Sequence, residues 1–274
     1  MALLVNMHYD NWSDYVAAAT APRTIRPNDA SHRPEDGHKS FFGTATWDVA
    51  VKLARDGWPD GLRNLKSASV DLAREQNGLI MTTAYFYDVS GDIVDVGRYC
   101  AGDPDCMINY TTEVVLSPRV VKIFVPISAC ASITPQTLYN RGAAALATID
   151  ALEHSGTRVE VIIFMSNKSA TSSSLITCTV KRAQDVLDLD VLAFTLCNAS
   201  TFRRLSWSIK ETWDAQTRKK LKIGAGYGMS IDYPKNLKEV GSIYIEQVND
   251  NADVVEAWAH VRKALVQAGI DLKM

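Results

Sequence analysis

The chain has 274 residues and a formal net charge of −2; 47% of its residues are hydrophobic and 22% are charged. This balance supports a sizeable core and excludes an intrinsically disordered protein. The apolar runs, such as 159–165, have the length of strands, and none reaches the roughly 20 residues of a membrane-spanning helix. The first residues lack the cationic start and long apolar core of a signal peptide. Five cysteines, three of them in apolar segments, favour a reduced protein in the cytoplasm.

Residues 1–40 predict a short helix followed by a mobile linker. Asn11 or Ser13 can cap a helix that ends before Pro22, and the polar, proline-containing stretch that follows is typical of a loop. This loop contains His32, Asp36 and His38, which leaves a metal site open as an alternative. Ligands on a loop carry an ordering cost, so we favour a linker without a metal.

A pair of helices is predicted next. Thr46 can cap a first helix that ends at Gly57, and a second helix is expected over 59–75. We expect Trp47 and Trp58 to attach this pair to the main body. A surface aromatic site for bases or ligands is the alternative.

The pattern then changes to short strands at 84–88 and 93–96, with a turn at Ser90 and Gly91 between them. This part of the chain is rich in aspartate: Asp88, Asp92, Asp95, Asp103 and Asp105. Their spacing does not match a calcium loop, and we interpret them as turn and strand-edge residues. Residues 41–112 are therefore predicted to form a helical pair plus short strands packed on the main body.

Residues 113–274 alternate strands and helices, which is typical of an α/β domain. Strands are predicted at 120–125, 158–165, 175–180 and 243–245, and helices at 135–154, 188–212 with a break near Asn198, and 251–268. In the last helix we expect the inward side chains to be Val255, Trp258, Ala259, Val261 and Leu265. The fold class predicted is α/β, a doubly wound and mainly parallel sheet with helices on both faces and an N-terminal helical extension.

The loop after the first of these strands carries a further signal. The run Ser128-Ala129-Cys130-Ala131-Ser132 and the following helix with Arg141 and Gly142 resemble von Willebrand factor A domains. In that family a motif Asp-x-Ser-x-Ser binds a divalent ion, and its three ligand positions correspond here to Pro126, Ser128 and Cys130. Proline offers no ligand and a thiol is too soft for magnesium. We therefore expect a degenerate site without a metal.

The segments 43–47 and 57–61, together with the Arg141–Gly142 helix, are also similar to a family of tailed-phage proteins. The resemblance covers residues 41–274. One described type in this family, from enquatrovirus-type coliphages, is a single-stranded DNA-binding factor that brings the phage RNA polymerase to middle promoters. The resemblance implies a DNA-binding accessory factor in the bacterial host cytoplasm. Its expected partners are single-stranded DNA and a phage RNA polymerase or another phage protein.

Motifs of common enzyme classes are missing from the sequence. It contains no phosphate-binding loop, nucleophile elbow, zincin helix or Cys-x-x-Cys pair. The glycine-rich run 223–228 is interpreted as a flexible loop, because it does not join a strand to a helix in a βαβ unit. We expect neither an enzyme nor a cofactor.

The strongest local signal is a basic stretch. Residues 202–222 carry seven cations and two anions, a net +5 in a chain whose total is −2. We predict a nucleic-acid site formed by Arg203, Arg204, Trp207, Lys210, Trp213, Arg218, Lys219, Lys220 and Lys222. The alternative is an ordinary amphipathic helix whose aromatic side chains are buried and whose cations are solvated. The competing function is a non-enzymatic protein–protein interaction module that uses the degenerate metal-site face.

Overall fold

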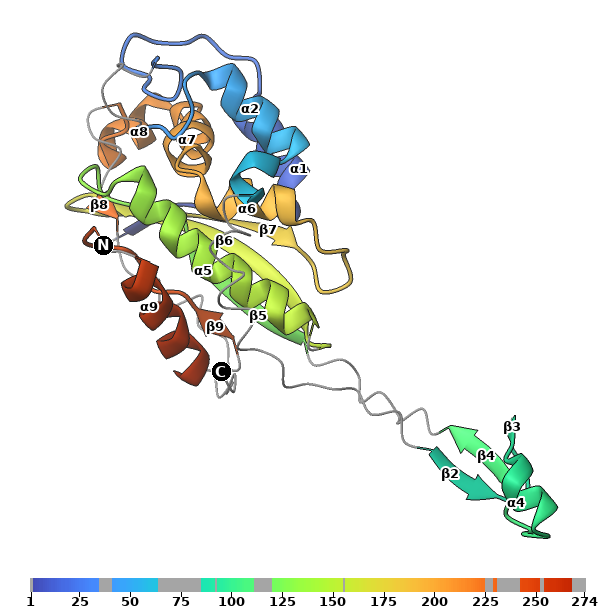
Figure 1. Ribbon diagram of the computed structural model, residues 1–274. Helices are drawn as coiled ribbons and strands as arrows, with labels where there is room; N and C mark the ends of the chain where they lie inside the picture. Colours follow the sequence, from blue (N-terminus) through green and yellow to red (C-terminus); the bar gives the residue numbers. More distant parts are fainter. Residues whose placement is uncertain are drawn as a thin grey trace.

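The computed structural model describes residues 2–34, 41–63, 85–91, 93–110, 120–154, 156–224, 229–230, 242–251 and 254–267. It shows a mixed α/β protein built on a six-stranded sheet in the order β1-β7-β6-β5-β9, with β8 beside β6 (Figure 1). The strands are β1 (Ala2–Tyr9), β5 (Val120–Pro126), β6 (Arg158–Lys168), β7 (Ser172–Lys181), β8 (Met229–Ser230) and β9 (Ile243–Tyr244).

The sheet is mainly parallel, as predicted. Parallel pairs join β5 to β6, β5 to β9 and β1 to β7, whereas β6 pairs antiparallel with both β7 and β8. Strand β7 is thus antiparallel to β6 within this mainly parallel sheet. Only three residues, 169–171, separate β6 from β7, and a parallel neighbour would need a crossover of a dozen or more residues.

Strand β1 is a feature that the sequence did not predict. It pairs parallel with β7, from Ala2 opposite Ser172 to Tyr9 opposite Cys178. The N-terminal segment thus adds an edge strand to the main sheet, as well as the predicted helix. The boundaries of the three predicted segments stay a prediction.

The predicted helices are confirmed in kind and in most of their ends. They are α1 (Trp12–Ala19), α2 (Trp47–Asp56), α5 (Pro135–His154), α6 (Leu189–Cys197), the π-helix η1 (Thr201–Ser206), α7 (Trp207–Glu211) and α9 (Val254–Gln267). Helix α8 (Ala215–Leu221) was not predicted, because the predicted helical stretch ends at residue 212. Asn11 caps α1 by accepting from the Asp14 backbone N–H at 2.8 Å, and Gly57 ends α2 with φ at 83°. A further helix begins at residue 59 and is described to residue 63; its predicted remainder lies outside the described residues.

One face of the sheet carries the main core. Alternate residues of β5 and β6, such as Val125 and Ile163, pack there with side chains of α1, α5, α6, α7 and α9. Figure 1 shows α5 running alongside the sheet next to α9. The opposite face has a smaller buried cluster that includes Phe124, Ile162 and Phe164. Among the described residues this cluster contains no helical side chain, so helices on both faces are not observed.

Helix α9 differs from the prediction in which side chains it buries. Val261 and Leu265 are buried as predicted, but Val255 is 74% exposed and Ala259 is also exposed. Ala257 and Ala264 are buried in their place. The helix is therefore rotated relative to the predicted stripe, with small residues turned toward the core where α9 packs against α5.

A second, three-stranded sheet has the order β2-β4-β3 and lies apart from the main sheet in Figure 1. It consists of β2 (Tyr85–Asp88), β3 (Ile93–Val94) and β4 (Met107–Tyr110), with a short helix α4 (Val96–Cys100). The two predicted strands are confirmed, whereas α4 was not predicted. Asp95 caps α4 and also accepts from the Tyr87 hydroxyl at 3.0 Å. We call residues 85–110 the arm.

Helices α5 and α6 approach so closely that only glycine fits at one position of their contact. A Cβ added at Gly142 would lie 2.2 Å from the carbonyl oxygen of Leu196. Backbone atoms form the obstacle, so a side-chain rotation cannot relieve it.

We predict that Gly142→Ala lowers the free energy of unfolding by about 1 to 3 kcal/mol, the usual cost of overpacking. Helix propensity alone would instead raise the free energy of unfolding of the alanine variant by roughly 1 kcal/mol. Urea unfolding of both proteins measures the difference. An alanine variant that is more stable than the parent would contradict the close contact.

Candidate nucleic-acid interface

The structure divides the seven cations among the nine predicted nucleic-acid residues into two groups. Arg203, Arg204 and Lys210 have an exposed fraction of 0%. Lys219, Lys220 and Lys222 are exposed, and Arg218 is half-buried. Burial keeps the first group away from any surface that a nucleic acid can contact, so only the second group remains as a candidate interface.

The hydrogen-bond donors of Arg204 find their acceptors in the N-terminal third of the chain. Its guanidinium lies 4.3 Å from the ring centre of Phe42. It also donates hydrogen bonds of 2.9 to 3.3 Å to Thr44 Oγ1 and to the carbonyl oxygens of Ser31, Arg33, Thr44 and Ala45. All five planar N–H donors that a guanidinium offers are directed at one folded loop. Arg204 therefore acts as a structural anchor.

Arg203 makes a similar connection to two other segments. Its Nη1 donates to the carbonyl oxygen of Phe41 at 2.7 Å, and its Nη2 donates to that of Ile133 at 2.6 Å. The guanidinium also lies 4.0 Å from the ring centre of Phe41. Burial lowers the pKa of Arg203 to about 10. Arg203 thus joins the segment before α2 to the loop that precedes α5.

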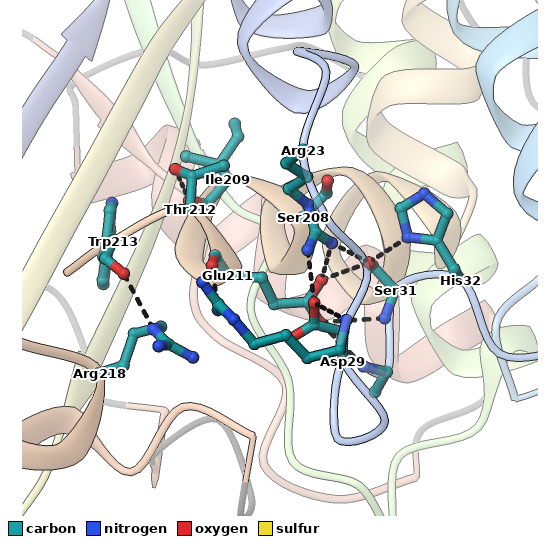
Figure 2. A network of polar contacts seen from close by, with 12 residues as sticks. Arg23, Asp29, Ser31, His32, Ser208, Ile209, Glu211, Thr212, Trp213 and Arg218 are labelled. Carbon is teal, nitrogen blue, oxygen red and sulfur yellow. Dashed lines mark hydrogen bonds and ion pairs between the residues drawn. The ribbon is translucent and has the colours of Figure 1, made fainter. Parts of the chain in front are cut away.

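Glu211 is the centre of the polar network in Figure 2. Its carboxylate is 1% exposed; it pairs with Arg23 and accepts from the backbone N–H groups of Ala30 and Ser31 at 2.9 and 3.1 Å. Arg23 also pairs with Asp29. Burial works to raise the pKa of Asp29, but hydrogen bonds from Arg26 and Arg23 outweigh it and lower that pKa. The network holds residues 23–31 on the end of α7.

Lys210 is a buried lysine with little to compensate its charge. Its ammonium donates to Asn167 Oδ1 and lies 5.1 Å from the ring centre of Phe202. Burial lowers the pKa of Lys210 to about 7. A lysine in this environment is partly neutral at physiological pH and does not serve as a fixed phosphate contact.

The two predicted tryptophans take part in packing. Trp207 is half-buried and lies 5.8 to 6.2 Å, between ring centres, from Phe41, Phe42 and Phe202. Trp213 packs against the cluster of Ala30, Leu221 and Ile223. The packing of Trp207 agrees with the alternative interpretation in its aromatic part, whereas Trp213 lies in the bend between α7 and α8 and not on a helix. Open stacking platforms for bases are therefore not formed by these rings.

The exposed group lies on α8 and the residue that ends it. Asp214 caps the helix by accepting from the backbone N–H groups of Gln216 and Thr217 at 2.9 and 3.0 Å. Lys222 ends it in the left-handed conformation, with φ at 58°. We call Arg218, Lys219, Lys220 and Lys222 the cationic face. Within the described part of the chain, no ion pair joins these four side chains to a carboxylate.

A cavity of about 560 Å³ opens beside the network. Its lining includes Tyr9, Arg26, Glu211 and Thr212. Arg26 donates to the carbonyl oxygen of Glu211 at 3.0 Å and is otherwise exposed. A cation of the loop after α1 thus borders the cavity. Outside its lining, the carbonyl oxygen of Trp213 accepts from Arg218 Nε at 2.9 Å (Figure 2).

The degenerate metal loop follows β5 at its carboxyl end. Ser128 is fully buried, and within the described residues its Oγ has no hydrogen-bond partner. Pro126 is the last residue of β5, and Cys130 is exposed. Cys130 is one of the three cysteines that the sequence places in apolar segments, and its exposure contradicts a buried position. Among the described residues, no group of three or more His, Cys, Asp or Glu side chains is placed to hold a metal.

The other sequence candidates are placed as packing residues. His32 stacks on Trp47 with ring centres 4.1 Å apart, and burial together with nearby Arg23 lowers the His32 pKa to about 4. Asp36 and His38 lie outside the described residues, so the metal alternative on this loop stays untested. Trp47 and Trp58 both pack against the main core, which confirms that they attach the helical pair to the body.

A family model described as a domain of unknown function, DUF7192, matches residues 3–271. The chain belongs to the DUF7192 family. The match extends from β1 to α9, so the DUF7192 unit includes both the arm and the cationic face. No curated protein and no solved structure matches the chain. Among the described residues of this DUF7192 protein, no helix has the length and apolar character needed to cross a membrane.

We predict that Arg204→Met lowers the free energy of unfolding by about 3 kcal/mol or more, because four carbonyl groups, those of Ser31 and Thr44 in buried hydrogen bonds, lose a charged donor. The exposed cation Lys219 provides the matched control. Lys219→Met is expected to change stability by no more than about 0.5 kcal/mol. Chemical denaturation of the two variants measures both effects, and an Arg204→Met protein as stable as the parent would contradict the anchoring role.

Lys210 gives a pH dependence with a defined sign. Its folded pKa of about 7 lies below its ordinary value of 10.5, so the unfolded chain binds more protons between these values. The contribution of this lysine to the free energy of unfolding therefore rises with pH above 7, because the lysine of the unfolded chain loses no proton there while that of the folded chain does. We expect the parent to gain about 1 to 2 kcal/mol more than Lys210→Met between pH 7 and 8.5. Urea unfolding across that interval tests this; parallel curves would refute it.

Proposed function

We propose that the protein is a non-enzymatic nucleic-acid-binding factor that contacts the phosphate backbone through the cationic face. The observation that carries this proposal is the exposure of Lys219, Lys220 and Lys222 next to Arg218, without an ion-pair partner among the described residues. Cations that are already paired within a protein gain little from a phosphate. Unpaired cations gather phosphates and release the counterions condensed on the nucleic acid.

Charged side chains with fixed hydrogen bonds give this surface its support. Arg204 and Glu211 fix residues 23–33 against η1 and α7, and Arg218 donates to the backbone just before α8. Trp207 and Trp213 are engaged in packing, so we expect recognition of the backbone with little preference for sequence. The cavity beside Arg26 is then free to receive a group that projects from the strand.

The single-stranded form of the nucleic acid and a phage RNA polymerase as partner are proposed from the resemblance to tailed-phage proteins alone. We propose in the same way that the sheet is a variant of the von Willebrand factor A fold. The succession of β5, loop, α5 and β6 agrees with that proposal. A protein–protein interaction module is the second candidate, because Ser128 Oγ is buried without a partner in the described structure at the carboxyl end of β5.

The test is a titration of a labelled single-stranded oligonucleotide at several salt concentrations. We expect Lys219→Glu/Lys220→Glu to weaken binding by about tenfold or more and to reduce the slope of log affinity against log salt by about 1.5, the contribution of two phosphate contacts. The matched control is Lys52→Glu/Arg55→Glu, which makes the same change in net charge on the exposed side of α2. This control should leave affinity within about twofold of the parent, apart from the general electrostatic effect.

Equal weakening by both double variants would mean that net charge alone acts, and the cationic face would lose its role. Unchanged affinity in the α8 variant would have the same consequence. In either case the interaction module at the Ser128 loop becomes the better candidate. A duplex of the same sequence, titrated in parallel, reports whether the single-stranded form is preferred.

A further inference from the structure

The arm exposes more apolar surface than a unit of its size can keep in water. Val89, Val96 and Tyr99 are 67%, 69% and 67% exposed, and Ile93 and Val94 are exposed as well. None of the arm side chains that the structure describes is buried. A three-stranded sheet needs a buried hydrophobic face for stability, and concentrated exposed apolar residues usually mark an interaction surface.

The arm is also strongly acidic. Residues 85–110 contain five aspartates and one arginine, a net charge of −4 in a chain whose total is −2. Arg98 is already engaged, since it lies 3.4 Å from Asp103 and stacks on Tyr87 at 3.7 Å. Asp88 and Asp105 are exposed, and neither forms an ion pair with a described residue. A surface that covers the arm should therefore be basic.

We propose that the arm docks on the cationic face of a second copy of this chain, giving a reciprocal dimer in which each arm covers the other copy's α8. The argument is charge complementarity: the arm carries unpaired aspartates, and the cationic face gathers three exposed lysines and Arg218 within five residues, without an ion-pair partner among the described residues. When two copies are related by a two-fold axis, the acidic patch of each copy can contact the basic patch of the other. The apolar side chains of the arm would be removed from water in the same contact.

This contact uses the surface assigned above to nucleic acid, although it does not depend on that function. If both proposals hold, arm and nucleic acid compete, and dimerisation reduces the binding capacity for phosphates. The arm would then act as an acidic substitute for the nucleic acid. Sedimentation and oligonucleotide titration report the two contacts separately, so the failure of one leaves the other measurable.

The experiment is analytical ultracentrifugation of the full chain with a pair of charge-reversal variants. Asp88→Lys/Asp105→Lys takes the net charge of the arm from −4 to 0 and leaves the cationic face intact. Lys219→Glu/Lys220→Glu takes the net charge of the cationic face from +4 to 0 and leaves the arm intact. Each variant alone therefore loses the attraction between opposite net charges at both contacts, and we expect its dimer dissociation constant to rise at least tenfold above that of the parent.

The mixture of the two variants is the decisive sample. In a mixed dimer, the two introduced lysines of one arm meet the two introduced glutamates of the other copy's face, and a native arm meets a native face. Pairs of opposite charge are thus restored at the altered contact, and we expect dimers to return to near the parental level. A parent that stays monomeric up to high concentration would overturn the proposal. So would variants that dimerise as well as the parent, or a mixture that remains monomeric. Thermal unfolding of each variant checks that the reversed residues, all exposed, leave the fold intact.

An apolar variant supplies independent evidence. Val96→Ser/Tyr99→Ser keeps every charge and removes two exposed apolar side chains, and we expect it to raise the dimer dissociation constant by tenfold or more. Unaltered dimerisation would show that apolar contact plays no part and would overturn the arm as the docking element. Oligonucleotide binding by this variant should equal or exceed that of the parent, because the cationic face is untouched.

Discussion

The buried guanidinium of Arg204 determines how the N-terminal third of the chain is arranged. Removing a charge from water is costly unless hydrogen bonds surround it, and here the partners come from the loop before α2. If this loop detached, the guanidinium of Arg204 would remain buried without its hydrogen-bond partners. The hydrogen bonds of one side chain on η1 therefore hold residues 31–33 and 44–45, and with them the segment from which α2 begins.

The regular elements were largely predictable because their signals are local. Asn11, Thr46 and Gly57 mark helix ends by capping chemistry, and the apolar run at 120–126 has the pattern of a central strand. Strand β1 and the antiparallel direction of β7 were not predictable in this way. An edge strand at the chain terminus has no flanking turn signals, and direction depends on the length of the connection.

The candidate site was predictable in position and only partly in composition. A run of cations shows that a segment is basic, but a buried arginine and an exposed lysine look alike in sequence. Glu211 illustrates the missing information: its partners Arg23 and Ser31 lie about 180 positions earlier in the chain. Their meeting depends on the complete fold. The aromatic spacing of Trp207 and Trp213 was equally compatible with packing, which is what the structure shows.

The pairing of β1 with β7 has a consequence for folding. Residues 2–9 lie more than 160 residues before their strand partner at 172–178, and Arg204 and Glu211 lie later still in the chain. Contacts this distant in sequence close slowly. We therefore expect β1 to join the sheet late in folding, after the hairpin of β6 and β7 has formed.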